Sequence, residues 1–89
     1  MTFELNNPKN YLYTHDLGCC TALMSAGFEL AGFDNTNPSQ VLFVFTRTPE
    51  LNQAEENYWA DTLEVKARTL FNNTKMLKSR IRNSYGGAN

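Results

Sequence analysis

The first long run of apolar positions, residues 15–26, predicts a helix that is buried on nearly all sides. Thr14 suits the N-cap of this helix, because its hydroxyl can accept a free amide hydrogen of the first turn. Gly27 suits the left-handed residue that closes a helix, and Phe28 supplies the apolar residue that often follows it. The start and stop signals therefore agree on one helix between Thr14 and Gly27.

Two apolar segments follow, at residues 28–33 and 41–47, and both predict strands. Residues 34–39 between them consist of Asp, Asn, Thr, Pro and Ser, a composition that favours a turn. This connection is too short for a crossover helix, so we predict an antiparallel hairpin. The second strand is apolar without alternation, so both of its faces need cover. Because two strands alone are marginal in water, further cover is expected from residues 2–5, from residues 11–13 or from another subunit.

The second half of the chain predicts two more helices. One starts at Thr48-Pro49 and runs to about residue 60, because proline is favoured at the first helical position. After a break near residues 61–63, a longer helix runs from about residue 65 to about residue 84. Its apolar positions recur at helical spacing and predict one inward face. These positions are Ala67, Leu70, Phe71, Thr74, Leu77 and Ile81.

Together the elements predict an α+β fold of the order (β)-α-β-β-α-α, in which the antiparallel hairpin packs on the helices. A chain of 89 residues supplies one hydrophobic core, so we expect a small single domain over residues 11–85. Residues 1–10 are predicted to form an N-terminal arm or an edge strand, and residues 86–89 a frayed tail.

Charge is distributed unevenly along the chain. Residues 1–64 contain two basic and nine acidic residues, a net charge of −7. Residues 65–89 contain six basic residues and no acidic one, a net charge of +6. This asymmetry is typical either of a basic segment that binds a polyanion or of an acidic body that neutralises its own tail. The isoelectric point of the whole chain, near 5.7, is lower than the value above ~9 that is usual for nucleic-acid-binding domains.

Two alternatives for the basic helix stay open on the sequence alone. If the helix binds nucleic acid, its cations contact phosphates, its neutral polar residues add hydrogen bonds, and Tyr85 stacks on a base. If instead the helix presents an ordinary solvated face, or the acidic segment 50–64 lies over it and neutralises its charges, the helix binds no polyanion. The basic residues concerned are Lys75, Lys78, Arg80, Arg82 and Arg68, with Asn72, Asn73 and Ser79 as neutral partners.

The residues that usually carry catalysis or metal binding do not form a recognisable site. His15 is the single histidine, and no nucleophile with a base and an orienting group accompanies it. Cys19 and Cys20 lie in the middle of the apolar helix, where a buried, unreactive thiol is the common case. One histidine with two adjacent cysteines does not match the spacing of a zinc site. We therefore predict a protein that is not an enzyme and that holds no cofactor and no metal.

A cytoplasmic protein without membrane association is expected. No apolar run approaches the ~20 residues that span a bilayer, and the first residues do not resemble a signal peptide. The adjacent cysteines exclude a disulfide framework. A helix and a strand that are apolar on all sides are hard to bury in so short a chain, which predicts a homodimer. Its interface is expected at Leu17, Leu23, Met24, Phe43 and Phe45.

Four short motifs follow one another along residues 11–82. They are Tyr13-Thr14-His15-Asp16-Leu17, the apolar helix closed by Gly27-Phe28, the strand Phe43-Val44-Phe45, and Leu77-Lys78-Ser79-Arg80 in the terminal helix. This arrangement resembles a family of small uncharacterised domains of bacteria and phages. The resemblance implies a compact α+β unit encoded by a phage or mobile element, and it brings no active site with it.

Two hypotheses for the function follow. The first is a non-enzymatic protein-interaction or accessory module, whose partner protein the sequence does not identify. Such a module would assemble through the apolar helix and the hairpin. The alternative is a small nucleic-acid-binding protein that uses the basic C-terminal helix.

Overall fold

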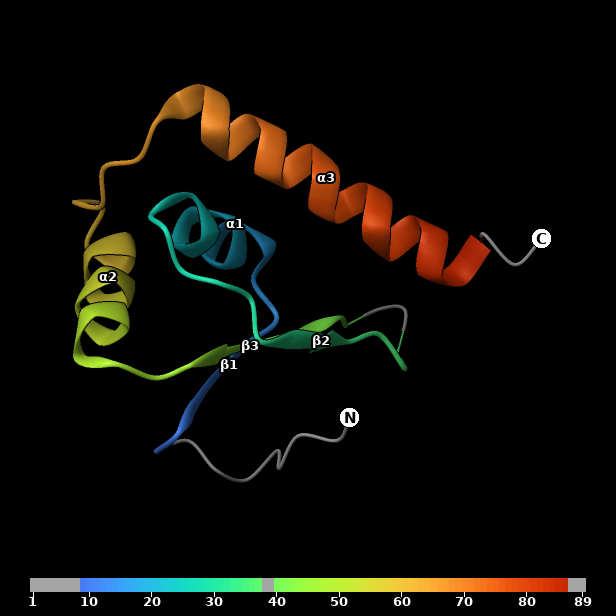
Figure 1. Cartoon of the computed structure of the whole chain (residues 1–89), viewed down its shortest axis with the longest axis horizontal. Coiled ribbons are helices and arrows are strands. Elements are labelled where there is room, and N and C mark those ends of the chain that lie inside the picture. Colours follow the sequence, from blue (N-terminus) through green and yellow to red (C-terminus); the bar gives the residue numbers. More distant parts are fainter. Residues whose placement is uncertain (1–8, 38–39, 87–89) are drawn as a thin grey trace.

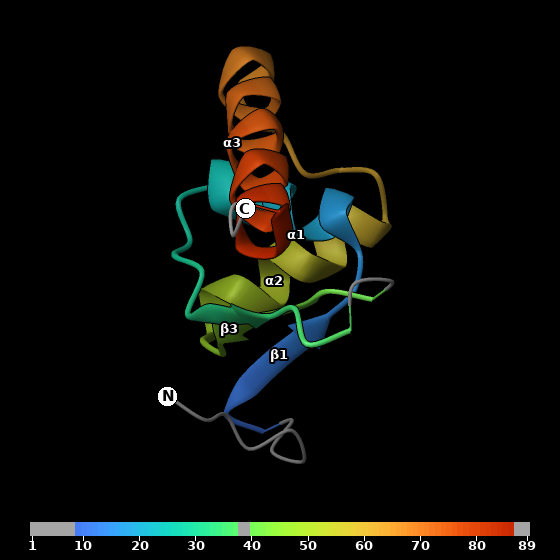
Figure 2. The ribbon, with the colours of Figure 1, turned by 90° about the vertical axis from the view of Figure 1, so that its right-hand side faces the viewer.

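The computed structural model describes residues 9–37 and 40–86, and it confirms the α+β fold and the order of its elements. Three helices lie on one side of a small antiparallel sheet (Figures 1 and 2). The predicted arm at 1–10 and tail at 86–89 lie largely outside the described residues. The elements are β1 (Tyr11–Thr14), α1 (Leu17–Ser25), β2 (Gly32–Asp34), β3 (Leu42–Thr46), α2 (Pro49–Trp59) and α3 (Ala67–Gly86).

The sheet has the strand order β1-β3-β2, so the apolar strand β3 is its centre. The predicted hairpin is present, because β2 pairs antiparallel with β3. Of the sources expected to complete it, the segment at residues 11–13 supplies the third strand, and β1 pairs with the other edge of β3. Phe45 lies opposite Leu12 and faces the helices, whereas Val44 points to the other side of the sheet. Both are fully buried, so the chain itself covers the two faces of β3.

The first predicted strand is shorter than expected, because its beginning belongs to the end of α1. The Phe28 amide donates to the Leu23 carbonyl at 3.1 Å, and the Gly27 amide donates to the Met24 carbonyl at 3.1 Å. Gly27 has a φ of +107°, which side chains other than glycine rarely adopt. These bonds form the predicted glycine cap of the helix. They hold residue 28 out of the sheet, and regular pairing starts only at Gly32.

The N-cap of α1 is Asp16 and not the predicted Thr14. The Asp16 Oδ1 atom accepts a hydrogen bond from the Cys19 amide at 2.8 Å. Thr14 is the last residue of β1, and its Oγ1 atom accepts from the Asp16 amide at 3.0 Å. The strand pairing of residues 11–14 therefore moves the start of the helix from residue 15 to Leu17.

The prediction for α2 is confirmed at its start, where Thr48 is the N-cap and Pro49 the first helical residue. The prediction for α3 is wrong at Ala67, which is exposed, and at Phe71, whose side chain is 63% exposed, whereas Leu77 is fully buried. The reason is the rotation of the helix about its axis. Six positions separate Phe71 from Leu77, which places them about 120° apart at 100° per residue. Since α1 contacts the side of Leu77, Phe71 faces away from it.

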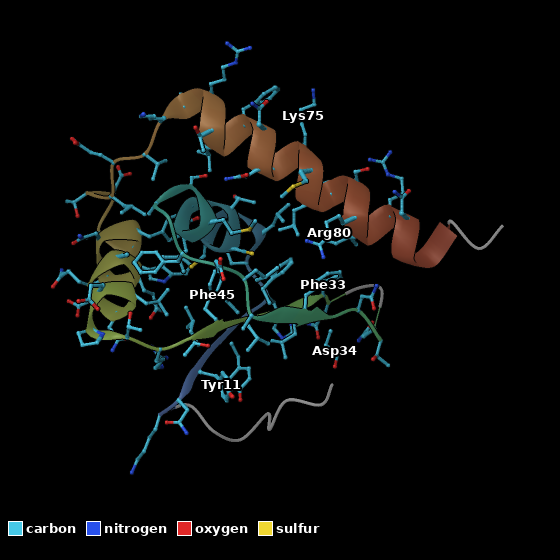
Figure 3. All side chains as sticks on the ribbon, viewed as in Figure 1. Tyr11, Phe33, Asp34, Phe45, Lys75 and Arg80 are labelled. Atoms are coloured by element: carbon cyan, nitrogen blue, oxygen red, sulfur yellow. The ribbon has the colours of Figure 1, made fainter. Side chains whose placement is uncertain are left out.

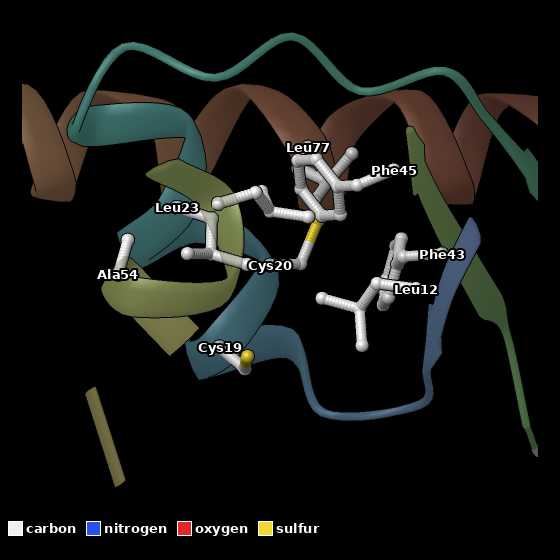
Figure 4. Packing of buried hydrophobic residues seen from close by; sticks show 9 residues of the cluster. Leu12, Cys19, Cys20, Leu23, Phe43, Phe45, Ala54 and Leu77 are labelled. Carbon is white, nitrogen blue, oxygen red and sulfur yellow. The ribbon is translucent and has the colours of Figure 1, made fainter. Parts of the chain in front are cut away.

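The core explains how an all-round apolar helix is buried in one protomer. Helix α1 packs against α2, α3 and β1, and its residues from Cys19 to Leu23 are buried. This contradicts the use of Leu23, Phe43 and Phe45 as interface residues, because each is at most 2% exposed within the chain. Leu17 and Met24 are half-buried and pack against the same cluster. Figure 4 shows the cluster, which contains Leu12, Cys19, Cys20, Leu23, Phe43, Phe45, Leu51, Ala54 and Leu77.

Candidate nucleic-acid interface

Most of the predicted basic residues form one line on the solvent side of α3. Residues three and four positions apart lie on the same side of a helix, and the line has the spacing 3, 4, 3, 4. Every member is exposed, and Figure 3 shows Lys75 pointing away from the rest of the molecule. We call this line the outer stripe. Its members are Arg68, Phe71, Lys75, Lys78 and Arg82.

Arg80 is the one predicted residue that lies elsewhere. Its guanidinium carbon lies 5.5 Å from the centre of the Phe33 ring of β2, a cation–π distance. Figure 3 shows Arg80 and Phe33 between α3 and the sheet. Arg80 is two positions from Lys78 and from Arg82, so it lies on a different side of the helix. Its contact fastens the C-terminal half of α3 to the sheet, and we leave it out of the outer stripe.

The acidic residues of α2 do not cover the outer stripe. Helix α1 packs against both α2 and α3 and lies between them (Figure 1). Glu55 of α2 pairs with Arg47, whose Nη1 atom lies 3.5 Å from Glu55 Oε1. None of the four cations of the outer stripe makes a salt bridge with any residue that the structure describes. The alternative in which the acidic segment neutralises the basic helix by direct pairing is therefore not what the geometry shows.

The outer stripe combines positive charge with one aromatic ring. The Lys75 ammonium lies 5.4 Å from the centre of the Phe71 ring, one turn earlier on the helix. Asn72 and Ser79 are exposed beside the stripe, as predicted for neutral hydrogen-bonding groups. Asn73 is not available in the same way, because its Nδ2 atom donates to Ser25 Oγ at 3.1 Å and joins α3 to α1. The side chain of Tyr85 falls outside the described residues.

The sequence alone assigned Phe71 to the core and not to this stripe. The available signal was the regular spacing from Arg68 to Arg82 with Phe71 at its second position. That signal becomes decisive only when Leu77 is known to mark the inner side of α3.

The two cysteines are buried in the core, in agreement with their predicted structural role. Burial, together with the negative charges of Glu55 and Asp16, raises the pKa of Cys19 to about 11. Burial also raises the pKa of Cys20 to about 12. Only a thiolate is nucleophilic, so neither thiol is activated at neutral pH.

We expect both cysteines to resist alkylation by iodoacetamide at pH 8 in the native protein and to react fully once urea unfolds it. The raised pKa values keep the thiols protonated, and burial keeps the reagent away from them. Mass spectrometry of the labelled protein counts the modified thiols. Rapid labelling of either cysteine under native conditions would show that α1 opens or that a thiol is reactive.

His15 is linked to Val41, the residue that precedes β3. Its Nδ1 atom lies 3.1 Å from the Val41 carbonyl oxygen, a distance at which the ring N–H donates a hydrogen bond. Across residues 9–37 and 40–86, no three side chains of histidine, cysteine, aspartate or glutamate converge on a possible metal position. Nor does that part of the chain contain a helix with the length and apolar character needed to cross a membrane.

The fold and the outer stripe define a small α+β domain with an exposed basic helix. Residues 9–83 match the family model described as a domain of unknown function, DUF5659. The match spans most of the chain, so this protein belongs to that family, which confirms the resemblance to a small uncharacterised domain but does not bear on a bacterial or phage origin. No curated protein and no solved structure matches the chain.

Proposed function

We propose that this domain binds nucleic acid through the phosphate contacts of the outer stripe. The observation that carries the proposal is the exposure of four cations on one side of α3, away from the acidic helix α2; none of them makes a salt bridge with a residue that the structure describes. Lysine and arginine side chains supply most contacts to phosphate, and these contacts need no specific base sequence. We propose no enzymatic function, and the prediction from the sequence that the protein is not an enzyme stays a prediction.

The length of the stripe suits several successive phosphates. Arg68 and Arg82 are 14 positions apart, which corresponds to about 21 Å along a helix that rises 1.5 Å per residue. One strand of a duplex carries a phosphate about every 3.4 Å, so this length passes about six of them. Four cations over that distance give a contact of moderate strength, and its affinity depends on displaced counterions.

The proposal predicts binding that weakens steeply with salt. With four phosphate contacts to a single strand, the slope of log K against log salt is about −2.8, so a rise from ~50 to ~200 mM lowers affinity about 50-fold. Fluorescence anisotropy of a labelled oligonucleotide, titrated at both salt concentrations, measures this slope. A complete lack of binding to DNA and RNA at ~50 mM salt would exclude the proposal, because the electrostatic affinity is greatest there.

Self-association as an interaction module is the second candidate. Among the described residues, three large apolar side chains are exposed, namely Trp59 at 59%, Phe71 at 63% and Met76 at 43%. Trp59 lies on α2, and the other two lie on different sides of α3. Such scattered residues support an interface less well than one continuous patch. The homodimer stays a prediction, and light scattering at micromolar concentration checks it. The phage or mobile-element origin and the cytoplasmic location also stay predictions.

A further inference from the structure

The outer stripe has an aromatic ring among its cations, and this ring takes no part in the core. Phe71 is 63% exposed, and it is neither in the buried cluster nor among the half-buried residues that pack against that cluster. Arg68 lies one turn before it on the same side of α3, and Lys75 lies one turn after it. The phenyl ring is therefore presented to solvent between two positive charges.

We infer that the outer stripe prefers single-stranded nucleic acid, with Phe71 as the surface on which an unpaired base stacks; this inference rests on the proposed function. An unpaired base offers its flat face to an aromatic side chain, and such stacking is used by proteins that bind single strands without sequence preference. In a duplex the faces are occupied by neighbouring bases, and the grooves present only base edges. The same ring thus adds affinity for a single strand and adds little for a duplex.

The spacing along α3 fits a base flanked by its two phosphates. Arg68 precedes Phe71 by about 4.5 Å along the helix axis, and Lys75 follows it by about 6 Å, at 1.5 Å per residue. The Lys75 ammonium, 5.4 Å from the ring centre, belongs to a flexible side chain that can turn toward a phosphate. When it does so, the ring face that it covers becomes available to the base. Lys78 and Arg82 then continue the phosphate contacts toward the C-terminal end.

The test compares a labelled oligo-dT single strand with the oligo-dT·oligo-dA duplex of the same length, at ~50 mM salt. We expect the wild-type protein to bind the single strand more tightly. Phe71→Ala should lower affinity for the single strand about 5- to 150-fold, the range for loss of one stacked base, and leave duplex affinity nearly unchanged. The salt slope should not change, because the substitution removes no cation.

Met76→Ala is the matched control, because Met76 is, besides Phe71, the large apolar side chain that is exposed in the described part of α3, and it lies on another side of the helix. It should leave both affinities unchanged. Equal binding of single strand and duplex by the wild type, or a loss shared by both ligands in Phe71→Ala, would overturn the inference while the proposed function stands. An equal loss in Met76→Ala would also overturn it. Failure of both ligands to bind would remove the proposed function and the inference together.

Discussion

Replacing Phe45 with alanine is expected to lower the free energy of unfolding by about 3–5 kcal/mol, the usual cost of removing a buried phenyl group. Phe45 is fully buried in the central strand β3, opposite Leu12 and within the cluster that joins the sheet to α1. A domain of this size has a total stability at the low end of about 5–15 kcal/mol, so much of the variant should be unfolded. Urea denaturation followed by far-UV circular dichroism measures the change.

The matched control for this substitution is Phe71→Ala, which removes the same atoms from an exposed position of α3. Because Phe71 lies outside the core, the change in unfolding free energy should stay within about 0.5 kcal/mol. A loss as large as that of Phe45→Ala would mean that α3 is rotated and that Phe71 packs inside. The control therefore tests the orientation on which the outer stripe depends.

The double variant Lys78→Glu, Arg82→Glu is expected to lose most of its affinity for nucleic acid. It removes two of the four cations of the outer stripe, so the slope of log K against log salt should become less negative by about 1.4 for a single strand. The new carboxylates repel phosphates and lower the affinity further. Both residues are exposed, so the fold should persist, with a cost of a few tenths of a kcal/mol from negative charge near the C-terminus of α3.

The variant Lys9→Glu, Lys66→Glu makes the same change in net charge with exposed residues that lie outside the outer stripe. It should keep the wild-type salt slope, since it removes no phosphate contact. Anisotropy titrations at several salt concentrations compare the two double variants, and circular dichroism confirms that both are folded. If both lose affinity equally, the overall charge of the protein governs binding and the outer stripe does not.

Features of the fold that depend on adjacent residues were predictable from the sequence. Thr48 and Pro49 start α2 as expected, and Gly27 closes α1 as expected, because caps act within one turn of the chain. The N-cap of α1 was missed because Thr14 and Asp16 are both suitable side chains. The choice between them is made by the pairing of β1 with β3, a contact across about thirty residues that local signals do not contain.

The functional residues show the same contrast between local signals, which the sequence contains, and contacts between distant segments, which it does not. The concentration of positive charge in α3 is visible in the sequence, but the side of the helix that faces solvent is not. Leu77 and the hydrogen bond from Asn73 to Ser25 fix that side, and both depend on where α1 lies. Three of the five residues predicted for the interface are buried within the chain for a related reason. Leu23 is buried because α2, α3 and β1 all pack around α1. The periodicity of one helix shows which side is apolar, but it does not show how many other elements pack against that helix.

The position of α1 between α2 and α3 gives the molecule a strong electric asymmetry. Helix α2 carries three acidic residues and no basic one, whereas α3 carries five basic residues and no acidic one. Although the net charge is only −1, an approaching polyanion is attracted on the side of α3 and repelled on the side of α2. Within a Debye length of about 10 Å at 0.1 M salt, these opposing forces turn the protein before contact. Encounters in which α3 faces a polyanion are thereby favoured.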